Sequence, residues 1–179
     1  MKSKSISWGR YPRHNFTLKY FNKNKILNYR NILPFGNGRS YGDSCVADVL
    51  CDMKNLNKFI RFDIKKGTMT LQAGVLLKDI IDISIPKGWF LKINPGTKLI
   101  TLGGAIAADV HGKNHHKQGC FSECVKWFKL ITNTGDEIKC SRNINSDYFH
   151  ATCGGMGLTG IITEAEIELK KINSSKILQ

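Results

Sequence analysis

Three stretches of this 179-residue sequence concentrate glycine in patterns suited to holding a ligand. The glycines gather at 36–42, 103–119 and 154–160 and are not spread along the chain. A residue without a side chain allows positive φ and lets the backbone approach another group closely, so such clusters indicate tight loops. The chemistry of this protein is therefore expected at loops.

The first cluster could hold a diphosphate. It consists of Pro34, Phe35, Gly36, Asn37, Gly38, Arg39, Ser40, Tyr41, Gly42, Asp43 and Ser44. Successive backbone N–H groups in such a loop form an anion-binding nest, to which Arg39 adds positive charge and Ser40 a hydroxyl donor. No Gly-Lys-Ser/Thr follows, and the spacing is not that of a dinucleotide fingerprint. A plain surface turn explains these residues as well as a phosphate cradle does.

The other two clusters indicate close packing. Residues 103–110 are small and apolar, which predicts a short helix lying against a flat ligand or another backbone; ordinary packing of a helix on a sheet is the alternative. Four glycines in residues 154–160 precede an alternating stretch, which indicates either another close approach or a tight helix-to-strand turn.

The end of the second cluster contains residues that could bind a metal ion. The candidate ligands are His111, His115, His116, Cys120 and Cys124. Zinc accepts such residues, but two of the histidines are adjacent, glycines interrupt any helix, and neither CxxC nor HExxH occurs. Loop histidines and core cysteines are the favoured interpretation, and no metal is predicted. A Cys–His nucleophile has no local signature either.

The charge is uneven. The chain carries 27 basic and 14 acidic residues, a net charge of +13, and nine basic residues precede the first acid, Asp43. Such an arm could attract nucleic acid, an anionic membrane or a phosphate-bearing ligand. It lacks basic–aromatic interleaving and any recognisable nucleic-acid module, so a solvated basic surface is favoured.

Composition excludes several classes of protein. No apolar run approaches the roughly 20 residues of a membrane span. Six cysteines are too sparse for a disulfide scaffold, and no export signal is present, which predicts reduced thiols in a cytoplasmic protein.

Periodicity predicts the elements that must position these loops. Strands are expected at 46–53, 60–64, 68–73, 89–93, 125–132, 137–140 and 161–169, and helices at 76–85, 103–110 and 147–153. In the last strand Glu164, Glu166 and Glu168 should face outward. Aromatic residues of the first 30 (Trp8, Tyr11, Phe16, Tyr20 and Phe21) are expected to anchor that segment. Several hairpins and no regular βαβ series indicate an α+β fold.

Taken together, the loops resemble those of a known family. The run 36–43 (GNGRSYGD), Pro95-Gly96-Thr97, the run 103–116 (GGAIAADVHGKNHH) and the run 154–162 (GGMGLTGII) are similar to the FAD-binding domain of vanillyl-alcohol-oxidase-type (PCMH-type) flavoproteins. The sugar-oxidising members of the decaprenylphosphoryl-β-D-ribose oxidase type are the most similar. Trp8-Gly9-Arg10 also matches the start of that group.

The resemblance implies two α+β subdomains with FAD between them, over residues 1–172 with a boundary near 94–104 and a tail at 173–179. It implies that Pro34–Ser44 wraps the diphosphate. Further cofactor contacts would come from Gly96, Thr101, Leu102, Gly103, Gly104, Ala108, Asp109, Val110, His111 and Ile162.

The resemblance also implies chemistry: oxidation of a CH–OH group of a sugar or polyprenyl-phosphate sugar by hydride transfer to FAD. His111 and Lys113 match substrate-side positions, and neither is assigned as the base. Relatives with covalent flavin carry a histidine where this chain has Asp43, and no cysteine lies near 94–97, so FAD should be non-covalent.

Full-length relatives also carry a substrate domain that this sequence lacks, so a separate chain could be needed to complete the site. A non-catalytic remnant or interaction domain, and less favourably a basic nucleic-acid-binding protein, are the alternatives.

Overall fold

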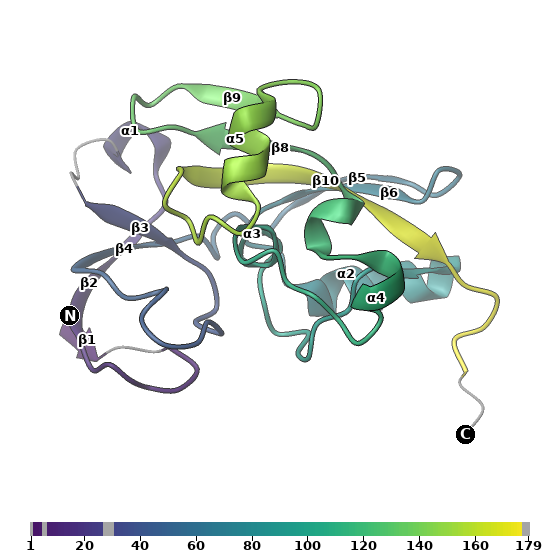
Figure 1. Cartoon of the computed structure of the whole chain (residues 1–179), viewed down its shortest axis with the longest axis horizontal. Coiled ribbons are helices and arrows are strands. Elements are labelled where there is room, and N and C mark those ends of the chain that lie inside the picture. Colours follow the sequence, from purple (N-terminus) through teal and green to yellow (C-terminus); the bar gives the residue numbers. More distant parts are fainter. Residues whose placement is uncertain (1, 5–6, 27–30, 177–179) are drawn as a thin grey trace.

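The chain folds into two sheets with helices, as a computed structural model shows. The structure describes residues 2–4, 7–26 and 31–176 (Figure 1). The mixture of hairpins, short helices and mainly antiparallel strands confirms the predicted α+β class.

The first sheet contains four strands in the order β1-β2-β4-β3. They are β1 (Lys2–Lys4), β2 (Asn15–Tyr20), β4 (Val49–Asp52) and β3 (Ile32–Phe35). β2 and β3 both run parallel to β4, and the short helix α1 (Lys23–Ile26) follows β2. The loop that leaves the carboxyl end of β3 is the first glycine cluster.

The second sheet has β10 at its centre. Its strands are β5 (Phe59–Asp63), β6 (Thr68–Gln72), β10 (Ile161–Lys171), β8 (Val125–Ile131) and β9 (Glu137–Cys140), in that order, and β7 (Trp89–Leu91) pairs with the end of β10. All of these pairs are antiparallel.

The predicted alternation in β10 is confirmed. Ala165, Ile167 and Leu169 are buried in the main core. The intervening glutamates face cross-strand partners: Glu164 accepts from Lys129 Nζ at 3.1 Å, and Glu166 from Thr70 Oγ1 at 2.9 Å. Paired charges and hydroxyls across strands fix the strand register.

Helices cover the apolar face of this sheet. They are α2 (Leu77–Ser84), extended by a 3₁₀ turn (Ile85–Lys87), α3 (Leu102–Ala107) and α5 (Ser146–Thr152), with a second 3₁₀ turn at Phe121–Cys124. The short helix α4 (His115–Gln118) buries none of its residues. Phe149 of α5 stacks on Phe128 of β8 with ring centroids 5.4 Å apart, and Ile106 of α3 is buried in the same core. The sheet and α3 therefore form a rigid support for the second glycine cluster.

The chain passes from the first sheet to the second between Asp52, the end of β4, and Phe59, the start of β5. Residues 94–104, where a boundary was predicted, lie between β7 and α3. A small core of Cys51, Met53, Ile131 and Ile161 joins the two sheets. The division into subdomains and the tail at 173–179 stay predictions.

The expected aromatic anchors are only partly present. Phe16 is buried, but Trp8, Tyr11 and Tyr20 are 58%, 76% and 75% exposed. The prediction was wrong for these three. Tyr20 lies in β2, which presents most of its side chains to solvent, and Trp8 and Tyr11 lie in the mostly exposed segment before that strand.

Within the residues described, no helix combines the length and the apolar character needed to cross a membrane. The cytoplasmic location stays a prediction.

One ion pair joins helix α1, which follows β2 of the first sheet, to strand β9 of the second sheet. Lys23 of α1 donates to Glu137 of β9, and this bond is the main reason that the pKa of Glu137 lies below its usual range. A carboxyl with a lowered folded pKa contributes stability above its unfolded pKa, about 4.3, and loses that contribution as pH falls through the folded value.

We expect Lys23→Met to lower stability at pH 7 by up to about 1 kcal/mol, the range for partly exposed pairs, and to have a smaller effect at pH 3. Urea unfolding at the two pH values measures this difference. Lys25→Met, in the same helix, is the control. An equal effect of Lys23→Met at both pH values would contradict the assignment.

Candidate cofactor-binding site

The first and second glycine clusters lie against each other. Asn37 donates through Nδ2 to the carbonyl oxygen of Leu99 at 2.8 Å. Gly36 faces Thr101 so closely that any Cβ at position 36 would collide with the threonine side chain. Only glycine allows this approach, so the loop after β3 is joined to the start of α3.

The third cluster closes onto the same place. Gly154 N donates to Ile106 O at 3.2 Å, and Met156 N donates to Ala107 O at 2.8 Å, which binds the loop to the end of α3. A Cβ at Gly157 would lie 3.1 Å from Pro34 Cγ, at the base of the first loop. The three clusters, of which the first and the third lie more than 100 residues apart along the chain, therefore meet around α3.

The first loop is shaped for an anion. Gly38 and Gly42 both have φ of +59°, a conformation that favours glycine. Arg39 donates through Nη1 to Asn37 O at 3.0 Å. Its Nε is buried and has no hydrogen-bond partner among the residues that the structure describes. A buried, unpaired donor of a cation is costly, so the loop fits a ligand that brings a negatively charged acceptor.

A pocket of about 590 Å³ is lined by segments that precede and follow α3 in the chain. Its lining combines two short segments, Asn94, Pro95 and Gly96 with His111, Gly112, Lys113, Asn114 and His115. Gly112 lies directly against the carbonyl of Asn94, and Asn114 Nδ2 donates to Lys92 O at 3.1 Å. The lining residues thus include two histidines and one lysine, whose side chains can interact with anionic or hydroxyl-rich ligands.

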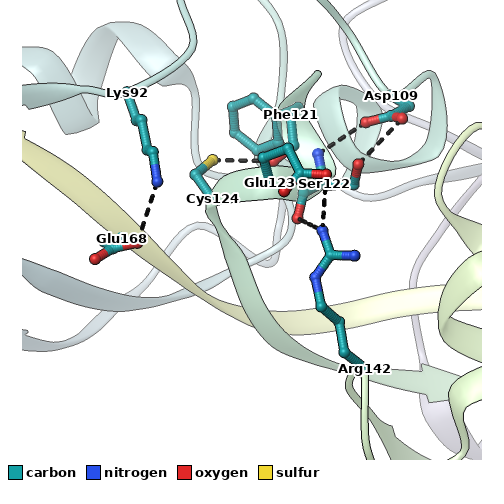
Figure 2. A network of polar contacts seen from close by, with 8 residues as sticks. All are labelled: Lys92, Asp109, Phe121, Ser122, Glu123, Cys124, Arg142 and Glu168. Carbon is teal, nitrogen blue, oxygen red and sulfur yellow. Dashed lines mark hydrogen bonds and ion pairs between the residues drawn. The ribbon is translucent and has the colours of Figure 1, made fainter. Parts of the chain in front are cut away.

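The loop that carries these residues is closed at its base (Figure 2). Asp109, at φ +40°, accepts from Ser122 N at 2.8 Å and from Ser122 Oγ at 3.1 Å. Phe121 N donates to Val110 O at 2.9 Å, and His111 bridges to Cys120. Both oxygens of the Asp109 carboxylate are thus used to hold the protein's own loop.

Figure 2 also shows Arg142 reaching this turn from beyond β9. Its guanidinium pairs with Glu123 at 3.1 Å and donates to Ser122 O at 3.3 Å. Sequence reasoning missed Ser122 and Arg142, since their contacts join positions 13 and 20 residues apart with no local motif.

The predicted cofactor residues differ in what they can offer a ligand. The exposed ones are Tyr41, Gly42, Asp43, Gly96, Gly104 and His111, and Lys113 is exposed as well. The half-buried ones are Pro34, Gly36, Asn37, Arg39, Ser40, Ser44, Gly103, Ala108, Asp109 and Val110. Phe35, Gly38, Thr101, Leu102 and Ile162 are buried.

Three of the predicted contacts have structural duties. Leu102 is fully buried, and its N–H donates to Val75 O at 2.8 Å. Gly103 donates to Ala73 O at 2.8 Å and packs on that residue, as helix-on-sheet packing requires. Thr101 caps α3 through Oγ1, which accepts from Gly104 N at 3.1 Å.

The histidines and cysteines weighed as metal ligands do not form a cluster. Among the residues described, no group of three or more His, Cys, Asp or Glu is arranged to hold a metal ion. Cys124 is buried, donates to Phe121 O at 3.0 Å, and has its pKa raised to about 12 by burial.

Four further cysteines were considered as candidate nucleophiles of a Cys–His enzyme. Burial raises the pKa of the Cys45 and Cys140 thiols, and that of Cys51 and Cys153 to about 12. Thiols that stay protonated at neutral pH are poor nucleophiles.

Comparison with known proteins identifies the family. Residues 16–141, well over half of the chain, match the family described as FAD binding domain. The chain belongs to this family. Decaprenylphosphoryl-beta-D-ribose oxidase of Mycolicibacterium smegmatis is 39% identical over 143 residues, which cover 78% of this chain and 31% of that protein.

Other members are more distant. D-lactate dehydrogenase of Anaerostipes hadrus is 27% identical over 85% of this chain and 33% of its own length. L-gulonolactone oxidase of Scyliorhinus torazame is 26% identical over 80% of this chain and 33% of its own length. The chain thus spans about a third of the length of these relatives.

Asp109→Ala removes two accepted hydrogen bonds and places alanine at a positive φ, so we expect a loss of about 1–3 kcal/mol in unfolding free energy. Asp109→Asn keeps an acceptor and tolerates that φ, so it should lose less. Urea unfolding measures both variants. Unchanged stability in Asp109→Ala would show that the carboxylate's contacts with Ser122 do not hold the loop.

Thiol titration tests the burial of the cysteines. At pH 8 we expect five thiols to react slowly with an aromatic disulfide reagent in the native protein and all six to react in denaturant. Cys120→Ser should leave the slow group unchanged. Rapid native reaction of two or more thiols would contradict the burial.

Proposed function

We propose that this chain binds FAD non-covalently where its three glycine clusters meet, as the cofactor-binding part of an oxidoreductase acting on a CH–OH group of a sugar or polyprenyl-phosphate sugar. The observation that carries the proposal is the convergence of the three clusters on α3, together with the buried and unpaired Arg39 Nε beside them. The family match supports FAD as the ligand.

The relatives support the cofactor more broadly than the substrate. They include a sugar oxidase, a lactone oxidase, a lactate dehydrogenase and a sterol reductase. They share with this chain a region that is about a third or less of their length. A shared region among enzymes with different substrates is best explained by a shared cofactor.

Specific residues would hold FAD. The loop from Gly36 to Ser44 supplies backbone donors and the guanidinium of Arg39 for the diphosphate. Gly96 and Gly104 leave exposed backbone against which a ligand can lie. When bound, FAD supplies two-electron redox chemistry, including acceptance of a hydride.

The chain's own polar groups would act on the substrate side. His111 and Lys113 are exposed and line the pocket. An ammonium group can orient a phosphate or a sugar hydroxyl, and an imidazole can accept a hydroxyl proton at neutral pH. Neither residue is assigned as the base. We include in the proposal that a separate or additional substrate domain completes the site.

Non-covalent attachment follows from the residue types at the site. Asp43 is an exposed carboxylate at the position where covalently linked relatives carry histidine, and the segment 94–97 contains no cysteine. Denaturation should therefore release all of the flavin, which ultrafiltration after acid precipitation measures. Flavin that stays with the precipitate would contradict this part of the proposal.

Titration of the purified chain with FAD by calorimetry tests the proposal directly. We expect saturable binding with one site, accompanied by a change in flavin fluorescence. Absence of binding by folded protein would refute it.

Two glycine variants locate the site. A Cβ at Gly96 meets no protein atom within 4 Å, so Gly96→Val should leave the melting temperature unchanged and weaken FAD binding about tenfold or more by occupying the cofactor's space. Gly36→Ala collides with Thr101 and should lower both stability and binding. Lys65→Ala, in the β5–β6 turn, is the control. Unchanged FAD affinity in Gly96→Val would place the cofactor elsewhere.

A further inference from the structure

The segment before β2 packs on the first glycine loop. Trp8 N donates to Ser40 O at 3.0 Å, and Ser7 is buried beneath this contact. Arg10 N donates to Ser7 O at 3.0 Å, and Ser7 Oγ donates to Tyr11 O at 3.3 Å, which turns the segment back on itself. In Figure 1 it is the purple stretch after β1, beside the blue loop between β3 and β4. It lies outside residues 16–141, which match the family.

The indole of Trp8 lies over the guanidinium of Arg39. The Arg39 Cζ is 5.6 Å from the centroid of the ring, within the range of a cation–π contact. On its other side the guanidinium donates through Nη1 to Asn37 O at 3.0 Å. These two contacts fix the plane of a side chain that would otherwise sample many rotamers.

The guanidinium held in this way is not fully satisfied. Nε is buried, yet nothing in the described part of the chain accepts its hydrogen. Trp8 itself is 58% exposed, so burial of the indole alone does not explain its position. A cation whose orientation is fixed while a donor stays unpaired is arranged for an acceptor that the protein does not supply.

From these contacts we infer that Trp8 is a positioning residue, which holds Arg39 so that its guanidinium donates to the diphosphate of the bound dinucleotide. The inference rests on the proposed function and extends the cofactor site to the segment 7–11. Trp8 acts through Arg39 and does not itself contact the dinucleotide. A preorganised cation binds an anion more tightly than a mobile one, because less rotamer freedom is lost on binding.

A double-mutant cycle on the full chain separates this role from the alternatives. FAD affinity is measured by calorimetry for the wild type, Trp8→Ala, Arg39→Ala and the double variant. Loss of a charge-assisted hydrogen bond predicts a decrease of about ten- to a hundredfold for Arg39→Ala. Loss of one cation–π contact predicts a decrease of roughly two- to fivefold for Trp8→Ala.

The decisive result is the cycle itself. If Trp8 acts through Arg39, Trp8→Ala should cause no further loss when Arg39 is already alanine. Trp8→Phe, which keeps an aromatic face, should retain most of the affinity. Tyr11→Ala, which removes another exposed aromatic side chain of the same segment, is the matched control and should bind FAD like the wild type.

Two results would contradict the inference, and a third would contradict the proposed function. An undiminished effect of Trp8→Ala in the Arg39→Ala background would show that the indole contacts the ligand itself, and would overturn the inference. Wild-type affinity in Trp8→Ala would overturn it as well. Failure of the wild type to bind FAD would instead refute the proposed function. Melting temperatures verify that each variant is folded.

Discussion

The site depends on backbone segments that approach each other more closely than side chains allow. Gly36 lies against Thr101, and Gly112 lies against the carbonyl of Asn94. At both positions a methyl group would force two loops apart. Because the loops come from three regions of the chain, this constraint converts separate turns into one continuous surface around α3.

That surface is stable because the layer beneath it is an ordinary packed core. β10 pairs with β6, β7 and β8, and its apolar side chains meet those of α3 and α5. Most residues of the loops that would contact the ligand are exposed or half-buried. The cations near the ligand site therefore lie on loops, and the packed strands and helices beneath hold those loops in place.

Local patterns predicted the elements of the second sheet, and through-space contacts decided much of the rest. The alternation of Glu164 and Glu166 with buried neighbours is visible in the sequence because a strand repeats every two residues. The pairing of Asp109 with Ser122 is not, since it depends on how a loop folds back. Similarly, glycine at 36 indicated a close approach, but only the structure shows that its partner is Thr101.

Packing also involves residues that the sequence predicts to contact the cofactor. Leu102 and Gly103 donate their N–H groups to Val75 O and Ala73 O, and their contact with FAD stays a prediction. Helix α3 packs on the sheet at these residues, so packing and ligand contact compete for the same small residues. Trp8 and Tyr20 were expected to anchor the first 30 residues, although an aromatic side chain can stay exposed when no second layer covers it.

The internal hydrogen bonds of the loops determine how a ligand would be received. Asn37 bonds to Leu99, and Gly154 to Ile106, through contacts that involve only the protein. The protein's own groups thus hold the three clusters together, and binding would cost little ordering of the backbone. The unsatisfied Arg39 Nε is the local exception, since its pairing requires an acceptor from outside. A site whose loops are held by the protein, and whose arginine keeps one donor unpaired among the described residues, selects ligands by charge placement. This suits a dinucleotide whose two phosphates are its most strongly acidic groups.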